Sequence, residues 1–201
     1  RFAYDSYRRF IQMYGNVVLE LDSSAFEELI ECEKEIENIK LDTEVSAESW
    51  KKITKQFKEL VKKKTGKDFP QNPIEQLWGS VGAVFSSWMN QRAITYRKLN
   101  DIPESWGTAV NVQAMVFGNM GDDCCTGVAF TRNPSTGENN YYGEYLVNAQ
   151  GEDVVAGIRT PQNLTIKEKR EQNSDSLCME ESIPIIYKEL VGIFVKLESH
   201  Y

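Results

Sequence analysis

The sequence has no long apolar run and few residues arranged to bind a metal. No stretch approaches the roughly 20 apolar residues that a membrane-spanning helix needs, and the opening residues, which include Arg1, Asp5 and Arg8, do not resemble a signal peptide. The four cysteines lack metal-site spacing, and the adjacent Cys124 and Cys125 make a poor disulfide framework. These absences predict a cytoplasmic protein with free thiols and no membrane partner.

Positive charge is outweighed by negative charge. The formal net charge is −7 and the pI is about 5.0, whereas a general nucleic-acid binder needs a surplus of Lys and Arg on some face. The one lysine-rich run, residues 51–67, follows a helical pattern, and such a charged face is more often a solvated surface than a phosphate or RNA patch. We therefore expect no nucleic-acid partner.

The 201 residues and 41% hydrophobic content allow one compact domain or two small ones. The sequence begins inside an amphipathic helical pattern and stops just after another, at residues 183–198. A natural domain more often begins and ends in a polar tail. We interpret the chain as a piece of a longer protein.

Residues 1–75 predict a helical subdomain. An aromatic stripe marks a first helix closed by Gly15, and a second helix follows Ser23 with its glutamates facing solvent. A third starts near Ser46 or Ser49 and ends at Gly66. No chemistry is evident in this part.

Residues 76–201 change in character. The helix expected at 74–90 is too apolar for a one-sided helix, which predicts burial on most sides. The run 109–117 has strand composition and is predicted to form a hairpin with 127–130. A polar loop over 163–182 then leads to an amphipathic helix at 183–198, with Pro184 in its first turn. Six of its residues are expected to face inward: Ile185, Ile186, Leu190, Ile193, Phe194 and Leu197.

The stretch from Gly127 to Pro161 carries the strongest functional signal. It sets two apolar strand-like runs, 128–130 and 145–147, beside polar turns that contain glycine, as in backbone-lined anion or nucleotide sites. Thr131 and Arg132 come at a strand end, before the predicted turn 133–137, where a hydroxyl and a guanidinium are able to meet phosphate oxygens. An ordinary polar hairpin turn explains this motif equally well.

Two longer segments resemble a known family. They read LWGSVGAVFSSWMNQRAITYRKLNDIPESWGTAVNVQAMVFGNMGDDCCTGVAFTRNPSTGE and GEYLVNAQGEDVVAGIRTPQ, and the similarity runs nearly unbroken from Leu77 to Gln162. Both are similar to the nucleotide-binding part of the pyruvate phosphate dikinase family. The opening RFAYDSYRRFIQMYG resembles the start of a helical insertion in the same region.

The resemblance implies an α+β fold, namely incomplete ATP-grasp lobes at 76–201 with an inserted helical subdomain at 1–75. It implies binding of ATP or AMP, phosphate and Mg²⁺. The longer parent, expected to be a homodimer, would interconvert ATP, phosphate and pyruvate with AMP, diphosphate and phosphoenolpyruvate through a phosphohistidine on another domain of the same chain. Such phosphoryl transfer needs mainly positioning and charge neutralisation from the nucleotide lobe.

The resemblance also suggests site residues. The segment 112–116 resembles the interlobe segment against which ATP-grasp enzymes lay adenine. The implied nucleotide-binding residues are Gln113, Met115, Val116, Thr131, Arg132, Arg92, Gln150 and Arg159. Glu144 and Glu152 are candidates for metal-adjacent roles, although a carboxylate beside glycine often only supports a turn.

Parts of the family's pattern are missing. The family also needs a basic segment before Arg1 and, after Tyr201, a strand with acidic metal ligands followed by a Gln-x-Arg pair. His200 lacks the Gly-rich threonine-histidine setting of the phosphohistidine domain. We expect no catalytic residue in this chain and no turnover by it alone. Phosphoenolpyruvate-dependent ATP synthesis by the isolated chain would refute that expectation.

Two other functions stay open from the sequence. One is a phosphoenolpyruvate synthase or related dikinase, although the synthase has a Gly-Leu-Gly-Glu run where this chain has GEYLVNAQGEDVV. The other is a non-catalytic interaction module that binds through the lysine face of 51–64.

Overall fold

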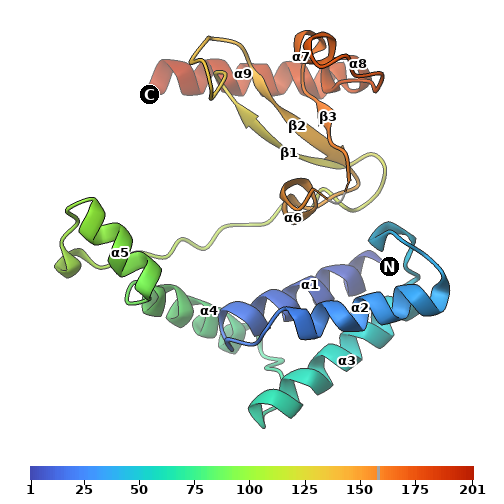
Figure 1. Ribbon diagram of the computed structural model, residues 1–201, viewed down its shortest axis with the longest axis vertical. Helices are drawn as coiled ribbons and strands as arrows, with labels where there is room; N and C mark the ends of the chain where they lie inside the picture. Colours follow the sequence, from blue (N-terminus) through green and yellow to red (C-terminus); the bar gives the residue numbers. More distant parts are fainter. Residues whose placement is uncertain (158) are drawn as a thin grey trace. The chain divides into compact units, whose positions relative to one another are not determined.

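The computed structural model describes residues 1–157 and 159–201, which form two compact units (Figure 1). The N-terminal unit spans Arg1–Gln113 and the C-terminal unit spans Ala114–Tyr201. The described residues are mainly helical, with one small antiparallel sheet, which confirms a mixed α+β class. None of the helices in these ranges is both long and apolar enough to cross a bilayer. The division expected at residue 75 stays a prediction.

The N-terminal unit is built from helices alone. Its elements are α1 (Phe2–Val17), α2 (Ser24–Glu37), the 3₁₀ turn η1 (Asp42–Glu44), α3 (Ala47–Thr65), α4 (Pro73–Ser87), α5 (Gln91–Leu99) and the 3₁₀ turn η2 (Glu104–Trp106). The predicted ends of α3 are confirmed, because the Ser46 side chain accepts a hydrogen bond from the Ser49 backbone N–H and Gly66 adopts φ 73°. No side-chain cap forms at Ser23, the residue before α2.

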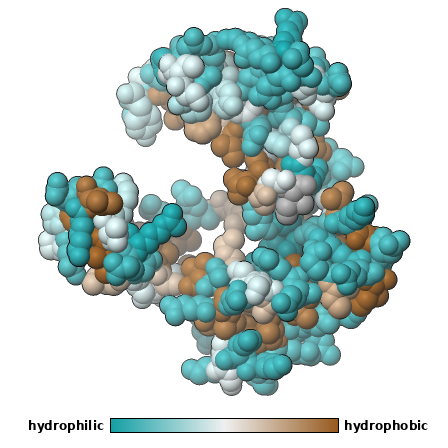
Figure 2. Space-filling view, viewed as in Figure 1, coloured by the Kyte–Doolittle hydropathy of each residue, from teal (hydrophilic) through white to brown (hydrophobic). Residues whose placement is uncertain are grey.

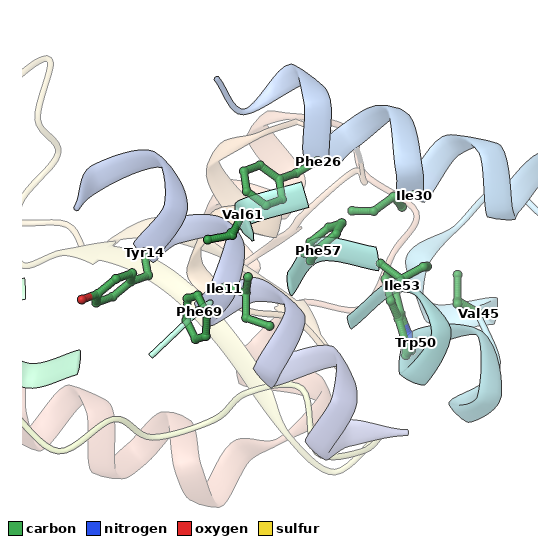
Figure 3. Packing of buried hydrophobic residues seen from close by; sticks show 10 residues of the cluster. All are labelled: Ile11, Tyr14, Phe26, Ile30, Val45, Trp50, Ile53, Phe57, Val61 and Phe69. Atoms are coloured by element: carbon green, nitrogen blue, oxygen red, sulfur yellow. The ribbon is translucent and has the colours of Figure 1, made fainter. Parts of the chain in front are cut away.

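A hydrophobic core joins α1, α2 and α3 (Figure 3). Trp50, Phe57 and Ile11 are fully buried in it, and the Phe26 ring meets the Phe57 ring edge-on at 4.9 Å. The prediction that Gly15 ends the first helix is wrong, since α1 continues to Val17. A Cβ at position 15 would lie 2.8 Å from the Phe26 ring, so this glycine permits close helix packing.

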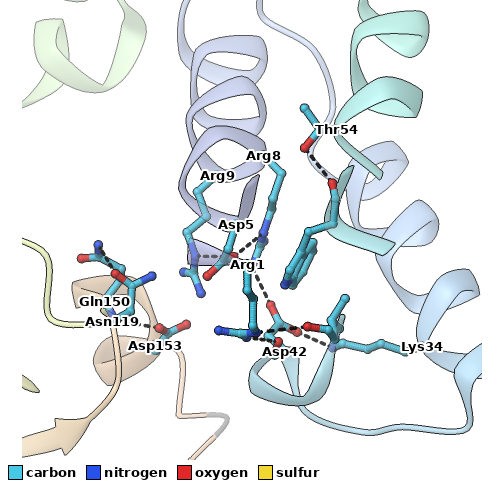
Figure 4. A network of polar contacts seen from close by, with 12 residues as sticks. Arg1, Asp5, Arg8, Arg9, Lys34, Asp42, Thr54, Asn119, Gln150 and Asp153 are labelled. Carbon is cyan, nitrogen blue, oxygen red and sulfur yellow. Dashed lines mark hydrogen bonds and ion pairs between the residues drawn. The ribbon is translucent and has the colours of Figure 1, made fainter. Parts of the chain in front are cut away.

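Several charged residues of the N-terminal unit are buried, although its charged helix faces were expected to be exposed to solvent. Arg8 is 4% exposed and pairs with Asp5 at 3.0 Å and with Asp42 at 2.6 Å (Figure 4). Glu33, expected on the wet side of the second helix, is 6% exposed because it accepts a 2.6 Å bond from Lys52 of α3. Ion pairing lets these groups leave water.

The expected burial of the apolar fourth helix is wrong. Asn72 caps α4, but none of its residues is buried, and Trp78 is 66% exposed. The helix meets α1 closely at Gly79, where a Cβ would lie 2.1 Å from the Tyr14 hydroxyl. Within the described N-terminal unit, no apolar side chains cover the other faces of α4. Figure 2 shows hydrophobic side chains also at the surface of the lobe that carries α5.

The C-terminal unit holds the sheet. Its elements are β1 (Cys125–Phe130), β2 (Tyr142–Val147), α6 (Gly151–Val155), β3 (Gln162–Asn163), α7 (Ile166–Glu171), α8 (Met179–Ser182) and α9 (Pro184–His200). The strands pair in the order β1-β2-β3, all antiparallel, with Gly127 opposite Tyr145 and Tyr145 opposite Gln162. The runs 128–130 and 145–147 are therefore strands, as predicted.

The predicted hairpin between 109–117 and 127–130 is wrong. Residues 109–117 form no strand, and β1 pairs with β2 instead. Val112 and Val116 are 73% and 90% exposed, so strand propensity here has no neighbouring strand to pair with. The boundary between the two units falls inside this run, between Gln113 and Ala114.

The two faces of the sheet differ. On one face Tyr145 packs with Leu164 and Met179, against partly buried side chains of α9 (Figure 1). On the other, Leu146 packs with Ala149 and with Val154 of α6. Near the hairpin turn this second face stays open, where the exposed side chains are Val128, Phe130 and Tyr142.

The tail differs from the predicted loop and one-sided helix. The segment 163–182 contains α7 and α8, and the buried Glu168 carboxylate ties α7 to β2 by accepting from the Gly143 N–H at 3.0 Å. Pro184 opens α9, as predicted. Of its six residues expected to face inward, Phe194 is buried and Leu190 is partly buried, whereas Ile185 is 77% exposed. The remaining expected positions are also exposed: Ile186, Ile193 and Leu197.

Candidate functional site

The predicted turn after β1 is confirmed in detail. The Asn133 side-chain oxygen accepts from the backbone N–H groups of Ser135 and Thr136, and the Gly137 N–H returns to the Asn133 carbonyl at 2.8 Å. Gly137 has φ 74°, a conformation that a side chain disfavours. This locally closed turn fixes the strand end that carries Thr131.

Arg132, next to Thr131, forms hydrogen bonds with a side-chain carboxylate of the same chain. Its Nε lies 2.9 Å from Oε2 and 3.1 Å from Oε1 of Glu198, and its Nη2 lies 2.7 Å from Oε2. The hydrogen bonds from Arg132 and, to a smaller extent, the nearby Thr131 side chain hold the pKa of Glu198 below its usual range. Arg132, one of the two residues predicted to meet phosphate, therefore binds a carboxylate.

A second polar group lies where β2 ends. Gln150 donates from Nε2 to the Asn119 side chain at 2.9 Å (Figure 4). Arg159 donates to the backbone carbonyls of Val147 and Asn148 at 2.8 and 3.1 Å. The predicted pair Gln150 and Arg159 thus lies in one neighbourhood, where it braces the end of the strand. Ile158, within the functional stretch, lies outside the described residues.

The strand register separates these two groups. Cys125 opposes Val147 and Phe130 opposes Tyr142, so Arg132 follows one end of the hairpin and Gln150 follows the other. Five residue steps along a strand span about 17 Å. The predicted residues Arg132 and Arg159 are therefore not brought together on one phosphate group.

The proposed metal residues do not form a metal centre by themselves. Glu144 is exposed on β2 and Glu152 is exposed in α6. Within residues 1–157 and 159–201 no group of three or more acidic, histidine or cysteine side chains is placed to hold a metal ion. The donor set present does not fit a complete magnesium site.

An open pocket of about 360 Å³ lies on the exposed part of the sheet. Its lining combines apolar strand side chains with polar groups: Val128, Phe130, Tyr142, Gly143, Glu144, Thr160, Pro161, Asn163, Glu168 and Gln172. Such a mixture of an apolar floor and a few polar groups is typical of small-molecule sites. Of the predicted residues, Glu144 lines this pocket.

The remaining predicted residues are exposed. Met115 and Val116 are 68% and 90% exposed in the segment that joins the units, and Gln113 is exposed beside them. Arg92 is exposed on α5, whereas the nearby Arg97 is buried, stacks 4.1 Å over the Trp88 ring and donates to the Trp88 carbonyl.

Sequence reasoning missed Glu198 and Asn119. Glu198 lies 66 residues from Arg132, and nothing in the local pattern of α9 distinguishes it from other helix-surface carboxylates. Asn119 follows Gly118, a setting in which asparagine is expected for backbone reasons alone.

Comparison with known proteins supplies the family. Residues 69–200 match the family described as "Pyruvate phosphate dikinase, AMP/ATP-binding domain". Pyruvate, phosphate dikinase of Rhizobium meliloti (strain 1021) is 59% identical over 201 residues, covering 100% of this chain and 22% of that protein. The Clostridium symbiosum enzyme is 54% identical over 202 residues, covering 100% and 22%. The chloroplastic enzyme of Mesembryanthemum crystallinum is 51% identical over 201 residues, covering 100% and 20%.

These matches confirm the resemblance to the pyruvate phosphate dikinase family. The chain spans about a fifth of the length of the curated relatives that it matches. The match extends over the helical N-terminal part as well as over the hairpin, so the whole chain shares one origin. The chain belongs to the pyruvate phosphate dikinase family, within its AMP/ATP-binding region.

Proposed function

We propose that this chain is the nucleotide-binding part of a pyruvate phosphate dikinase, and that Thr131 and Arg132 contact the phosphates of ATP. The longer protein would interconvert ATP, phosphate and pyruvate with AMP, diphosphate and phosphoenolpyruvate. A phosphohistidine domain elsewhere in the same protein would carry the phosphoryl group. We further propose an ATP-grasp arrangement, a homodimeric parent and a cytoplasmic location, in agreement with free thiols at all four cysteines.

One observation carries the phosphate assignment. Arg132 binds both oxygens of the Glu198 carboxylate through charge-assisted hydrogen bonds of 2.7, 2.9 and 3.1 Å. A phosphate presents the same kind of paired anionic oxygens, and Arg is suited to bind them in a two-point geometry. The turn at 133–137 holds these donors in place before any ligand arrives.

The other candidates have supporting roles in this proposal. Gln113, Met115 and Val116 would contact adenine from the segment between the units, and Arg92 would add positive charge. Gln150 and Arg159 would keep the far end of the hairpin rigid. Glu144 and Glu152 would lie near Mg²⁺ and supply at most two carboxylates, which is enough only if phosphate oxygens, water or other parts of the protein complete the shell.

The test is calorimetric titration of the 201-residue chain with ATP and Mg²⁺. Replacing Arg132 by Gln removes a charged donor pair worth about 1.5–3 kcal/mol, so the Kd should rise roughly tenfold or more. The matched control is Arg170→Gln, which removes one positive charge from an exposed position on α7. Equal affinities for the wild type and R132Q would refute the assignment.

A further inference from the structure

We infer that the Glu198 carboxylate is an internal anion that holds Arg132 until phosphate replaces it, so that nucleotide binding detaches the Glu198 segment of α9 from the hairpin turn. This inference rests on the proposed function.

Competition follows from the donors that Glu198 uses. Arg132 turns its Nε and Nη2 toward this carboxylate, at 2.9 and 2.7 Å, while its Nη1 lies 3.4 Å from the Gly137 carbonyl. A phosphate that binds the paired Nε and Nη2 edge of the guanidinium must therefore displace Glu198.

The ion pair is weak enough to exchange. The side chains of Arg132 and Glu198 are 49% and 26% exposed, and ion pairs with such solvent access contribute little net stability. A polyphosphate carries several negative charges, so its attraction to Arg132 exceeds that of one carboxylate. A phosphate is therefore able to displace the Glu198 carboxylate from Arg132, and the carboxylate is able to return when the phosphate leaves.

Displacement would act on the last turn of α9. Phe194 is buried and meets the Tyr141 ring at 4.9 Å, which anchors the middle of the helix. Beyond it Val195 is 57% exposed and Leu197 is 41% exposed. Among the described residues, Glu198 provides the polar attachment of this part of α9 to the hairpin turn. Losing that attachment would leave residues 195–200 less firmly held, so their amides should exchange faster.

The experiment titrates inorganic triphosphate into the 201-residue chain, because this probe carries the phosphate chemistry without adenine. Glu198→Gln should tighten binding about two- to fivefold, the range expected from removing a partly exposed competing ion pair. The matched control is Glu189→Gln, an exposed carboxylate on the same helix. The double variant R132Q/E198Q should lose the gain.

The outcomes separate the two claims. Affinity of E198Q equal to or below that of the wild type, with binding still dependent on Arg132, would overturn the inference and leave the proposed function standing. Binding that ignores Arg132 would overturn both. Hydrogen exchange gives a second measurement: triphosphate should speed amide exchange in the last turn of α9 in the wild type, and that turn should exchange fast in E198Q without ligand. Unchanged exchange in either case would also overturn the inference.

Discussion

Asp42 is the hub of a charge network that ties η1 to α1 and α2, and its replacement by Asn should destabilise the N-terminal unit. One carboxylate oxygen lies 2.6 Å from Arg8 Nη2 and the other lies 2.6 Å from Lys34 Nζ (Figure 4). The Arg8 and Lys34 side chains are 5% and 12% exposed. Removing the negative charge leaves two poorly solvated cations with weaker partners.

The expected cost lies between two limits. Breaking a fully buried ion pair costs about 3–5 kcal/mol, but Asp42 is 32% exposed and Arg8 keeps its bond to Asp5. Asparagine also retains one acceptor oxygen. We therefore expect Asp42→Asn to lower the free energy of unfolding of this unit by about 1–3 kcal/mol.

The pH dependence gives a second signature. Burial alone would raise the pKa of Asp42, but the charge of Arg8 and the bond from Lys34 hold that pKa below its ordinary value. A depressed folded pKa gives stability that is present above the unfolded pKa of about 3.9 and lost as pH falls through the folded value. The difference between wild type and D42N should thus be full at pH 7 and shrink below about pH 3.9.

Urea unfolding followed by tryptophan fluorescence is the assay, because all four tryptophans lie at positions up to 106, in the N-terminal unit. Asp68→Asn is the control: it makes the same chemical change at an ion pair with Lys62 in which the Asp68 side chain is 81% exposed, and its cost should stay within about 1 kcal/mol. Equal losses in D42N and D68N, or a D42N loss that does not change between pH 7 and pH 3, would contradict this reasoning.

Three predictions concern the C-terminal unit. Gly118→Ala places a Cβ 2.6 Å from two backbone carbonyl oxygens, so thermal unfolding should show a loss of about 2 kcal/mol or more; an unchanged Tm would be inconsistent with this packing. Glu168→Gln weakens the buried acceptor that holds the Gly143 N–H, and we expect a loss of about 1–3 kcal/mol in chemical denaturation, which a neutral result would disprove. Lys169 and a backbone N–H lower the pKa of Glu181 to about 2, so an NMR titration should show this carboxylate ionised at pH 3. Lys169→Met should raise the titration midpoint of Glu181, and an unchanged midpoint would contradict the pairing.

The helical pattern was largely readable from local signals. α3 begins after Ser46 and ends before Gly66, as expected, because capping depends on the residue itself and its nearest backbone neighbours. The turn at 133–137 was equally local, and Pro184 opens α9. The sequence also identified the family, since long stretches of matching residues need no structure to compare.

Partners distant in sequence were not readable. The run 109–117 has the composition of a strand, yet β1 pairs with β2, because pairing depends on which strand lies alongside. The apolar α4 was expected to be covered on most sides, and its exposure shows that periodicity reports a preference for burial without providing the cover. Glu33 was expected to face solvent, but it is buried, and Lys52 of another helix pairs with it.

The candidate site divides in the same way. The amino-acid sequence by itself determined the family and the turn and led to the proposal that Thr131 and Arg132 contact phosphate, because those features depend on matching or neighbouring residues. Only the tertiary structure decided that Arg132 and Gln150 end opposite sides of the hairpin and that Glu198 bonds to Arg132. Strand register and a contact across 66 residues depend on how the chain folds back on itself, which a local pattern does not encode.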